Sequence, residues 1–241
     1  MTIKLIQSDV FDWLATAEND SVDCVVTSPP YWQQRDYGHD DQIGQETSLR
    51  DYLEIMADFA HKLHPICKHS ATFWMVIGDK FVGGRQMCIP HKLIGMFKPW
   101  ILIQDIIWNK PNPMPMNVKR RFTPAHEHVL FFVKSVNGYY FKQAVEPATY
   151  AGQTRGRKRQ CRRGADGKVY NTRNKRDVWT VRPVSTMGHE APFPEDLIRP
   201  CIASGCPPGG TVLDPFMGTG TTGLVAHEFG CNFTGVDLNI A

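Results

Sequence analysis

The chain has 241 residues, 42% of them hydrophobic and 21% charged, which suits one α/β domain with a sizeable core and excludes wholesale disorder. Its apolar runs are shorter than the roughly 18 to 20 residues of a membrane helix, and the N-terminal residues lack a signal-peptide pattern, so we expect a cytoplasmic protein. The net charge of +3 is unevenly distributed, since residues 151–182 carry +9 and the rest of the chain −6, which points to a polyanionic partner.

In the first half of the chain, predicted strands alternate with predicted helices. The expected strands are 3–7, 22–27, 71–78, 101–110 and 128–134. The expected helices are 9–16, a helix that begins at Thr47 or Ser48 and ends before Pro65, and 87–97. The strand VDCVVT at 22–27 is mostly apolar, as is typical of a sheet covered on both faces.

Periodicity is lost between about residues 135 and 187, where the chain is polar, basic and dotted with aromatic residues. We interpret this stretch as an insertion with little structure of its own, or as one that is ordered on its ligand. Order resumes with a helix that begins near Pro194, then the strand TVLDPF, a glycine-rich turn, the helix TTGLVAHEF and the strand NFTGVDL. Strands that alternate with helices favour a doubly wound, mostly parallel sheet.

The turn MGTGTTG satisfies the pattern G-x-G-x-x-G through Gly218, Gly220 and Gly223. It follows a strand, opens a helix and leads to a second strand carrying Asp237, which is the context of a nucleotide-binding turn. The alternative is a tight turn that needs glycine only for its backbone geometry. Because this turn lies near the end of the chain, the other strands come from the N-terminal half, and this permuted order disfavours a nicotinamide dehydrogenase.

Several separated motifs resemble those of the beta group of DNA amino-methyltransferases, and the resemblance covers almost the whole chain. The motifs are TSPPYW, FWMVIGD, IIWNKPNPMP, RFTPAHEHVLFFVK, HEAPFPEDLIRPCI, DPFMGTGTT and GVDL. The resemblance implies a Rossmann-like, doubly wound α/β fold of the S-adenosylmethionine-dependent methyltransferase type, with a permuted motif order and an inserted basic target-recognition segment.

The same resemblance implies three parts: a catalytic half over 1–134, a target-recognition insertion over 135–188 and a cofactor-binding half over 189–241. Family members continue past the acid-bearing strand into another helix, whereas this chain ends at Ala241. We therefore expect one wall of the cofactor pocket and one face of the sheet to be uncovered.

The family binds S-adenosylmethionine, and its binding residues can be carried over by position. They are Asp9, Pro192, Phe193, Asp214, Pro215, Phe216, Gly218, Thr219, Gly220, Thr221 and Asp237. Asp237 would bind the ribose and Asp9 the adenine edge. The ligand suits this set, because it has a carboxylate for backbone N–H groups, a diol for a carboxylate and an apolar adenine.

The predicted catalytic residues are Ser28, Pro29, Pro30 and Tyr31. The lone pair of an exocyclic amine is delocalised into the base, and hydrogen bonds accepted from both N–H groups favour a more tetrahedral, nucleophilic nitrogen. Ser28 Oγ and the Pro29 carbonyl are the expected acceptors, since proline fixes φ and has no N–H to compete. Tyr31 would stack on the base once it is flipped out of the duplex, which supplies roughly 1–3 kcal/mol.

Contacts to double-stranded DNA are predicted for the residues after the catalytic motif and for the basic segment. These residues are Trp32, Arg35, Arg155, Arg157, Lys158, Arg159, Arg162, Arg163, Arg173, Lys175 and Arg176. Arginines there could neutralise phosphates or read guanine edges. The alternatives are packing for Trp32 and a solvated basic loop for the rest.

The methylated base is left open between cytosine-N4 and adenine-N6. Ser28, rather than an acid or an asparagine before Pro-Pro-Tyr, resembles the cytosine-N4 subgroup. A non-catalytic nucleic-acid-binding relative is a further alternative. Ring-carbon methylation is disfavoured, because the Pro-Cys pair at Cys201 lies in a predicted helix.

No metal site is expected, because the seven cysteines form no CxxC pair and the paired histidines lack accompanying acids. The expected partners are DNA and a cognate restriction endonuclease that acts on the same site. The family suggests a monomer or homodimer in a bacterial or phage-infected cell.

Overall fold

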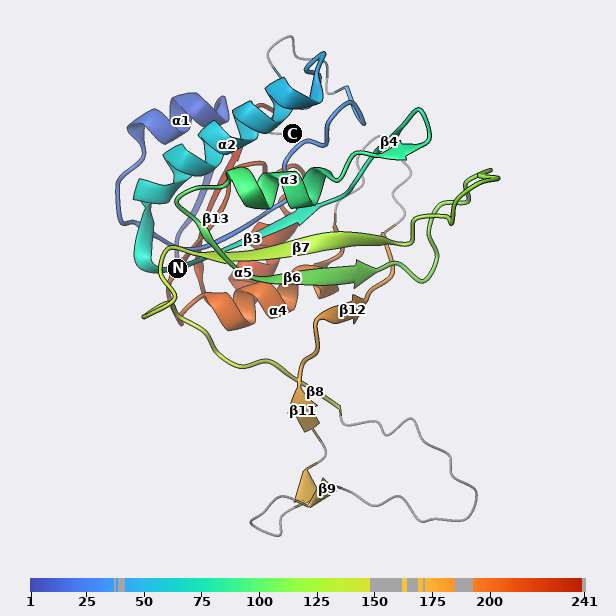
Figure 1. Ribbon diagram of the computed structural model, residues 1–241. Helices are drawn as coiled ribbons and strands as arrows, with labels where there is room; N and C mark the ends of the chain where they lie inside the picture. The colour runs from blue at the N-terminus through green and yellow to red at the C-terminus, as the bar shows by residue number, and fades with distance from the viewer. Residues whose placement is uncertain are drawn as a thin grey trace.

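The computed structural model describes residues 1–36, 38, 42–147, 172–184 and 193–239, and the backbone of 162–163 and 169–170. Its centre is an eight-stranded sheet (Figure 1). In spatial order the strands are β1 (Ile3–Gln7), β14 (Asn232–Asp237), β13 (Thr211–Asp214), β2 (Val22–Thr27), β3 (Cys67–Ile77), β7 (His126–Val133), β6 (Ile101–Asn109) and β12 (Val178–Thr180). All neighbours are parallel except β3–β7 and β7–β6, which confirms the predicted mostly parallel sheet.

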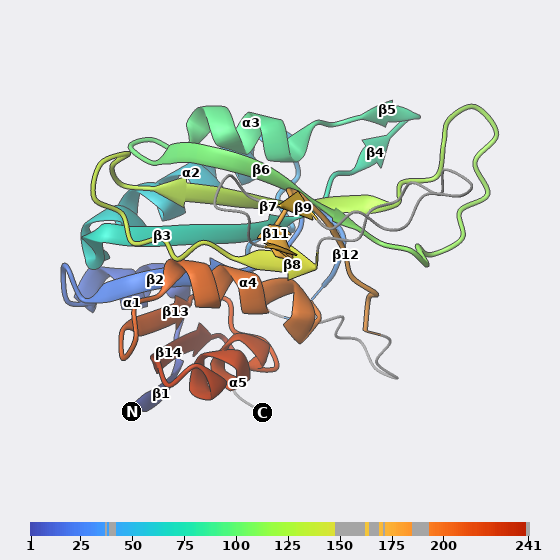
Figure 2. The same cartoon turned by 90° about the horizontal axis from the view of Figure 1, so that it is seen from below.

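Helices cover both faces of the sheet, as a doubly wound fold requires (Figures 1 and 2). One face carries α1 (Val10–Thr16), α2 (Leu49–Ile66) and α3 (Ile89–Met96), and the other carries α4 (Glu195–Gly205) and α5 (Thr221–Glu228). Ser48 caps α2, since its hydroxyl accepts the Asp51 N–H at 3.1 Å. The predicted end of α2 before Pro65 is wrong, because the proline lies inside the last turn and the helix ends one residue later.

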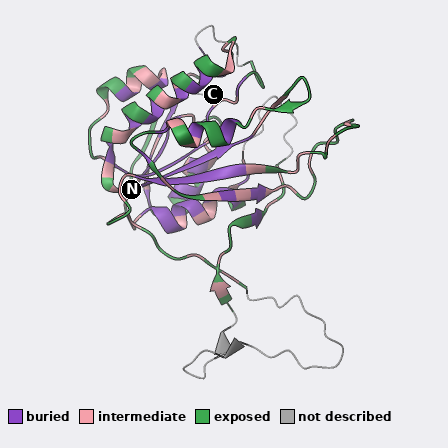
Figure 3. Cartoon of the chain, in the orientation of Figure 1, coloured by how far each residue is buried: buried purple, intermediate pink, exposed green. Residues whose placement is uncertain are grey.

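Alternate residues of β3 enter two separate cores. Phe73, Met75 and Ile77 pack in the core beneath α1, α2 and α3, and Trp74 and Val76 pack in the core beneath α4 and α5. This division follows from the two-residue period of a strand. Figure 3 shows the buried residues concentrated in the strands and on the inner sides of the helices. The continuous apolar runs of the sequence are therefore explained by burial on both faces.

The polar segment after residue 134 is more ordered than the interpretation of an insertion with little structure of its own. Strand β8 (Val145–Pro147) pairs with β11 (Thr172–Asn174), and β9 (Arg162–Arg163) pairs with β10 (Val169–Tyr170). Figure 1 shows β8, β9 and β11 away from the sheet. Strand β12, by contrast, joins the sheet edge beside β6, where Trp179 is buried. The boundaries 135–188 stay a prediction.

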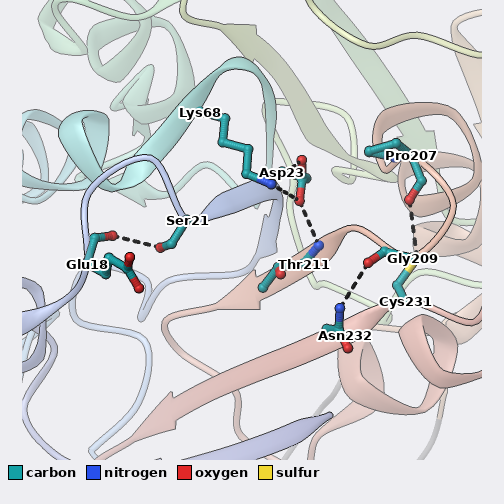
Figure 4. Close-up of polar contacts among 9 residues, drawn as sticks. All are labelled: Glu18, Ser21, Asp23, Lys68, Pro207, Gly209, Thr211, Cys231 and Asn232. Atoms are coloured by element: carbon teal, nitrogen blue, oxygen red, sulfur yellow. Dashed lines mark hydrogen bonds and ion pairs between the residues drawn. The ribbon is translucent and has the colours of Figure 1, made fainter. Parts of the chain in front are cut away.

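A polar network ties the amino end of the sheet together (Figure 4). The buried Asp23 carboxylate of β2 accepts hydrogen bonds from Lys68 Nζ at 2.8 Å and from the Thr211 N–H at 2.9 Å. Asn232 Nδ2 donates to the Gly209 carbonyl at 2.9 Å. These contacts join β2, β3, β13 and β14 at the end where their loops carry none of the predicted site residues.

Among the helices of the described residues, none has the length and hydropathy needed to cross a membrane. The short hairpin of β4 (Phe81–Val82) and β5 (Arg85–Gln86) projects beyond β3, in the same direction as the loop between β6 and β7 (Figure 2).

Candidate active site

A cavity of about 1000 Å³ opens at the carboxyl ends of the parallel strands. Ligands of doubly wound folds bind at this end, where the loops that follow neighbouring strands meet. Its lining includes both the Ser28–Tyr31 turn after β2 and the glycine turn after β13. Ile3 and Leu5 of the edge strand β1 also line it and are about half exposed, at 50% and 54%. Two motifs almost two hundred residues apart in sequence therefore share one site.

The glycine turn is held open by its backbone. Gly218 and Gly220 have φ angles of +52° and +79°, which L side chains rarely adopt. A Cβ built on either glycine meets no atom within 4 Å, so it would project into open space. The Gly218 N–H donates to Asp237 Oδ2 at 2.8 Å, and Asp237 Oδ1 accepts the Asn239 N–H at 3.0 Å.

Most predicted cofactor residues line this cavity. They are Asp9, Phe193, Pro215, Phe216, Gly218, Thr219, Gly220, Thr221 and Asp237. Asp9 is also the N-cap of α1, because its Oδ1 accepts the Phe11 N–H at 2.7 Å and the Asp12 N–H at 3.3 Å. Pro192 lies outside the described residues.

Asp214 does not reach the cavity, against its predicted role as a cofactor ligand. Its side chain is fully buried and accepts the hydroxyl protons of Thr27 and Thr222, both at 2.6 Å, and the Phe216 N–H at 3.2 Å. Burial raises the pKa of Asp214 to about 6, and the nearby Asp237 carboxylate adds a smaller contribution. The residue supports the glycine turn from below.

The predicted catalytic turn leaves β2 in a fixed conformation. Ser28, Pro29, Pro30 and Tyr31 all line the cavity. The Tyr52 hydroxyl donates to the Pro30 carbonyl at 3.0 Å, which ties the turn to α2. The Ser28 hydroxyl donates to the Tyr31 hydroxyl at 3.5 Å. This direction leaves the Ser28 lone pairs available as acceptors.

Glu127 and Lys110 belong to the site, although the sequence reasoning assigned them no role. The Tyr31 hydroxyl donates to Glu127 Oε2 at 3.0 Å, and Lys110 Nζ binds Glu127 Oε1. Both residues line the cavity and are about four-fifths buried. Burial, and next the Glu127 charge, raise the pKa of Tyr31 well above its usual value, so its hydroxyl stays a donor.

Gly78, at the end of β3, allows the tyrosine to approach this glutamate. A Cβ on Gly78 would lie 2.9 Å from Tyr31 Cε2 and 3.3 Å from Glu127 Cγ. The antiparallel register then sets Glu127 beside Trp108, next to Lys110. A signal for this cluster existed in the sequence: the acid of HEHVLFF opens a buried strand within one of the motifs.

Comparison with known proteins identifies the family. The N6/N4 methyltransferase family model, described as DNA methylase, matches residues 22–241. The chain is 34% identical over 267 residues to the Type II methyltransferase M.Cfr9I of Citrobacter freundii, covering 98% of this chain and 83% of that protein. It is also 34% identical over 269 residues to the Type II methyltransferase M.SmaI of Serratia marcescens, covering 98% and 86%. The chain belongs to the N6/N4 DNA methylase family.

Solved structures of related folds resemble this methylase over nearly its whole length. The PvuII DNA methyltransferase (cytosine-N4-specific) aligns with a TM-score of 0.71 at 18% identity, covering 99% of this chain and 83% of that one. The DNA modification methylase TTHA0409 of Thermus thermophilus, complexed with S-adenosyl-L-methionine, aligns with a TM-score of 0.68 at 23% identity, covering 99% and 88%. These similarities confirm the predicted fold class.

The predicted DNA contacts of the methylase fall into different surroundings. Trp32 is only 6% exposed, and its indole N–H donates to the Glu46 carbonyl at 2.9 Å. It therefore packs in the core instead of facing DNA, against its predicted role. Arg35 is exposed and lines the cavity, as a contact at the mouth requires.

In the basic segment, the described arginines are held by the protein itself. Arg173 Nε and Arg176 Nε donate to Glu146 Oε1 at 2.8 and 2.7 Å, and Lys175 Nζ lies 4.9 Å from the centre of the Trp179 ring. Hydrogen bonding by Arg176 keeps the pKa of Glu146 below its usual value. Arg162 and Arg163 are described in their backbone alone, and Arg155, Arg157, Lys158 and Arg159 lie outside the described residues.

Proposed function

We propose that this methylase transfers a methyl group from S-adenosylmethionine to the exocyclic N4 amine of a cytosine flipped out of double-stranded DNA. The observation that carries the proposal is the single cavity lined by both the Ser28–Tyr31 turn and the Gly218–Thr221 turn. Such a cavity brings an amine acceptor and a methyl donor together, and proximity with alignment is the main source of catalysis in such a displacement.

The lining of the cavity fits S-adenosylmethionine. Asp237 offers carboxylate oxygens for ribose hydroxyls, and the open backbone of Gly218 and Gly220 leaves room for close approach. Phe193 and Phe216 supply apolar surface for the adenine. When bound, the cofactor supplies an activated methyl group.

The chain's own residues would prepare the amine. The hydroxyls of Ser28 and Tyr31 point in sequence toward Glu127, so the lone pairs of Ser28 Oγ face outward to accept an amine N–H. The Pro30 carbonyl is already taken by Tyr52, which leaves the adjacent Pro29 carbonyl as the second expected acceptor. The methylated nitrogen must then lose one proton, and Ser28 is positioned to accept it and pass one along to Glu127.

The choice of cytosine rests on two supports. Ser28 is a neutral acceptor, and the fold resembles that of a cytosine-N4-specific enzyme. The alternative is adenine-N6 methylation, because the matched family includes both activities.

Nucleoside analysis tests the proposal. DNA incubated with the protein and labelled S-adenosylmethionine is digested, and the labelled nucleoside is identified by mass spectrometry. We expect N4-methylcytosine. N6-methyladenine alone would overturn the choice of base, and no label from a folded protein would overturn the enzyme itself.

A Glu127→Gln variant tests the hydrogen-bond chain. Loss of the carboxylate removes the charged acceptor of Tyr31, and we expect kcat to fall about 100-fold, the range for one preorganised active-site group. The affinity for S-adenosylmethionine, measured by calorimetry, should stay unchanged. An exposed carboxylate on α2, changed as Glu54→Gln, serves as the control. Wild-type kcat in Glu127→Gln would contradict the role of the chain.

We also propose that the methylase works with a restriction endonuclease of the same site in a bacterial cytoplasm. The support is the name Type II methyltransferase that its relatives carry.

A further inference from the structure

The loop between β6 and β7 lies beside the mouth of the active-site cavity. We call residues 111–125 the arm. The residues that flank it, Lys110 and Glu127, line the cavity, and the Lys110 N–H donates to the Ala125 carbonyl at 2.8 Å, which closes its base. Figure 2 shows the arm extending well beyond the ends of the two strands. Any duplex that delivers a base to this cavity must pass close to it.

The surface of the arm combines cations with exposed apolar side chains. The arm contains Lys119, Arg120 and Arg121 and no acid. The Phe122 side chain is 96% exposed and Met114 is 84% exposed. Three prolines in PNPMP fix their φ angles and stiffen the loop. A single exposed apolar residue needs no explanation, but two on a stiff cationic loop beside an active site indicate a partner.

One cation of the arm is used to hold it in place. The Arg121 guanidinium lies 3.9 Å from the centre of the Phe81 ring on β4. The β4–β5 hairpin is itself fixed, because the Asp79 carboxylate accepts the N–H groups of Cys88 and Ile89 at the start of α3. Lys119, Arg120 and Phe122 flank this anchored residue and remain exposed.

We propose that the arm binds the DNA duplex next to the flipped base, with Lys119 and Arg120 on phosphates and the Phe122 ring against the base stack. The inference rests on the proposed function. Positive charge without acids complements the DNA backbone. Phenylalanine is among the side chains that insert between base steps, and a flipped base leaves a gap in the stack that such a ring fills.

Salt dependence of DNA binding tests the phosphate contacts. A short fluorescein-labelled duplex is titrated with wild type, with Lys119→Gln/Arg120→Gln and with the control Lys4→Gln/Lys98→Gln, whose lysines are exposed at the other end of the sheet. The slope of log K against log salt should decrease in magnitude by about 1.8 for the arm variant, because each phosphate contact contributes about 0.9. An unchanged slope overturns the phosphate contacts.

A second pair of variants tests the ring. In a duplex with 2-aminopurine beside the base that the wild type methylates, Phe122→Ala should lose most of the fluorescence rise on binding, and kcat/KM should fall about tenfold. The control is Phe229→Ala, an exposed phenylalanine that follows α5. Affinity for S-adenosylmethionine and Tm should be unchanged in both. Wild-type fluorescence and rate in Phe122→Ala overturn the contact with the stack.

Failure of the arm and failure of the proposed function are distinguishable. If the wild type labels no DNA, the proposed function fails, while the salt slope still judges the arm. If the wild type labels DNA and both arm variants behave as wild type, the arm proposal alone is wrong.

Discussion

Strands β2 and β13 are joined at both ends by a buried aspartate, and the two aspartates have different partners. At the amino end, Asp23 of β2 binds the Thr211 N–H of β13 at 2.9 Å and Lys68 Nζ at 2.8 Å. At the carboxyl end, Asp214 of β13 accepts the Thr27 hydroxyl of β2 at 2.6 Å, together with donors from the turn and α5 that are also neutral. The first aspartate is paired with a cation, and the second meets neutral donors.

This difference follows the division of labour between the two ends of the sheet. The amino end carries none of the described predicted site residues, so its charges can be arranged for stability. The carboxyl end must keep the glycine turn open, and under the proposed function it receives a positively charged sulfonium. A lysine beneath the turn would repel that ligand. Asp214 therefore supports the turn without a cation, and its raised pKa is the electrostatic consequence.

The largest effect that we expect from this comparison is a pH dependence of stability at Asp214. Burial raises its pKa from 3.8 to about 6, so between these values the folded state holds a proton that the unfolded chain has lost. This contribution to stability is fully present below pH 3.8 and is lost as the pH rises through 6. Relative to Asp214→Asn, the wild-type free energy of unfolding should fall by about 3 kcal/mol across this window.

Urea unfolding of both proteins at several pH values between about 4 and 8 measures this difference. Asp23→Asn, followed over the same range, is the matched control at the other end of the strands. A difference between wild type and Asp214→Asn that does not change with pH would contradict the burial argument.

A smaller loss of stability is expected when the amino-end pair is broken. Asp23→Asn leaves Lys68 without its anionic partner in a site where the aspartate side chain is 7% exposed. We expect the free energy of unfolding to fall by about 2 kcal/mol, less than for a fully buried pair because Lys68 reaches solvent. The methylation rate per folded molecule should be unchanged, since this network lies at the end of the sheet away from the cavity. A reduced rate at full folding would show that the two ends are coupled.

Much of the fold could be predicted because burial is written into apolar runs. VDCVVT at β2 lies between two cores, and its composition reflects that. Strand β12 could not be predicted, because three residues, Val178–Thr180, are too few to show a period. Its place depends on pairing with β6 and on the burial of Trp179, which are tertiary contacts.

The candidate site divides in a similar way. The glycine turn was predictable because positive φ angles select glycine, as at Gly218 and Gly220. Glu127 was not, because its partner Tyr31 lies 96 residues away and the contact depends on the register of β6, β7 and β3. Asp214 and Asp237 both close a strand in the sequence, and packing alone directs one beneath the turn and the other into the cavity.

The smallest effect concerns Asp9, whose carboxylate both caps α1 and lines the cavity. Asparagine caps a helix about as well as aspartate, so Asp9→Asn should keep wild-type stability, whereas Asp9→Ala should lose about 1 kcal/mol in urea unfolding. If the carboxylate also accepts the adenine amine, Asp9→Asn should weaken S-adenosylmethionine binding about tenfold in calorimetry, equivalent to about 1.4 kcal/mol. Wild-type affinity in Asp9→Asn would make Asp9 a cap alone, a structural carboxylate at the functional end of the sheet.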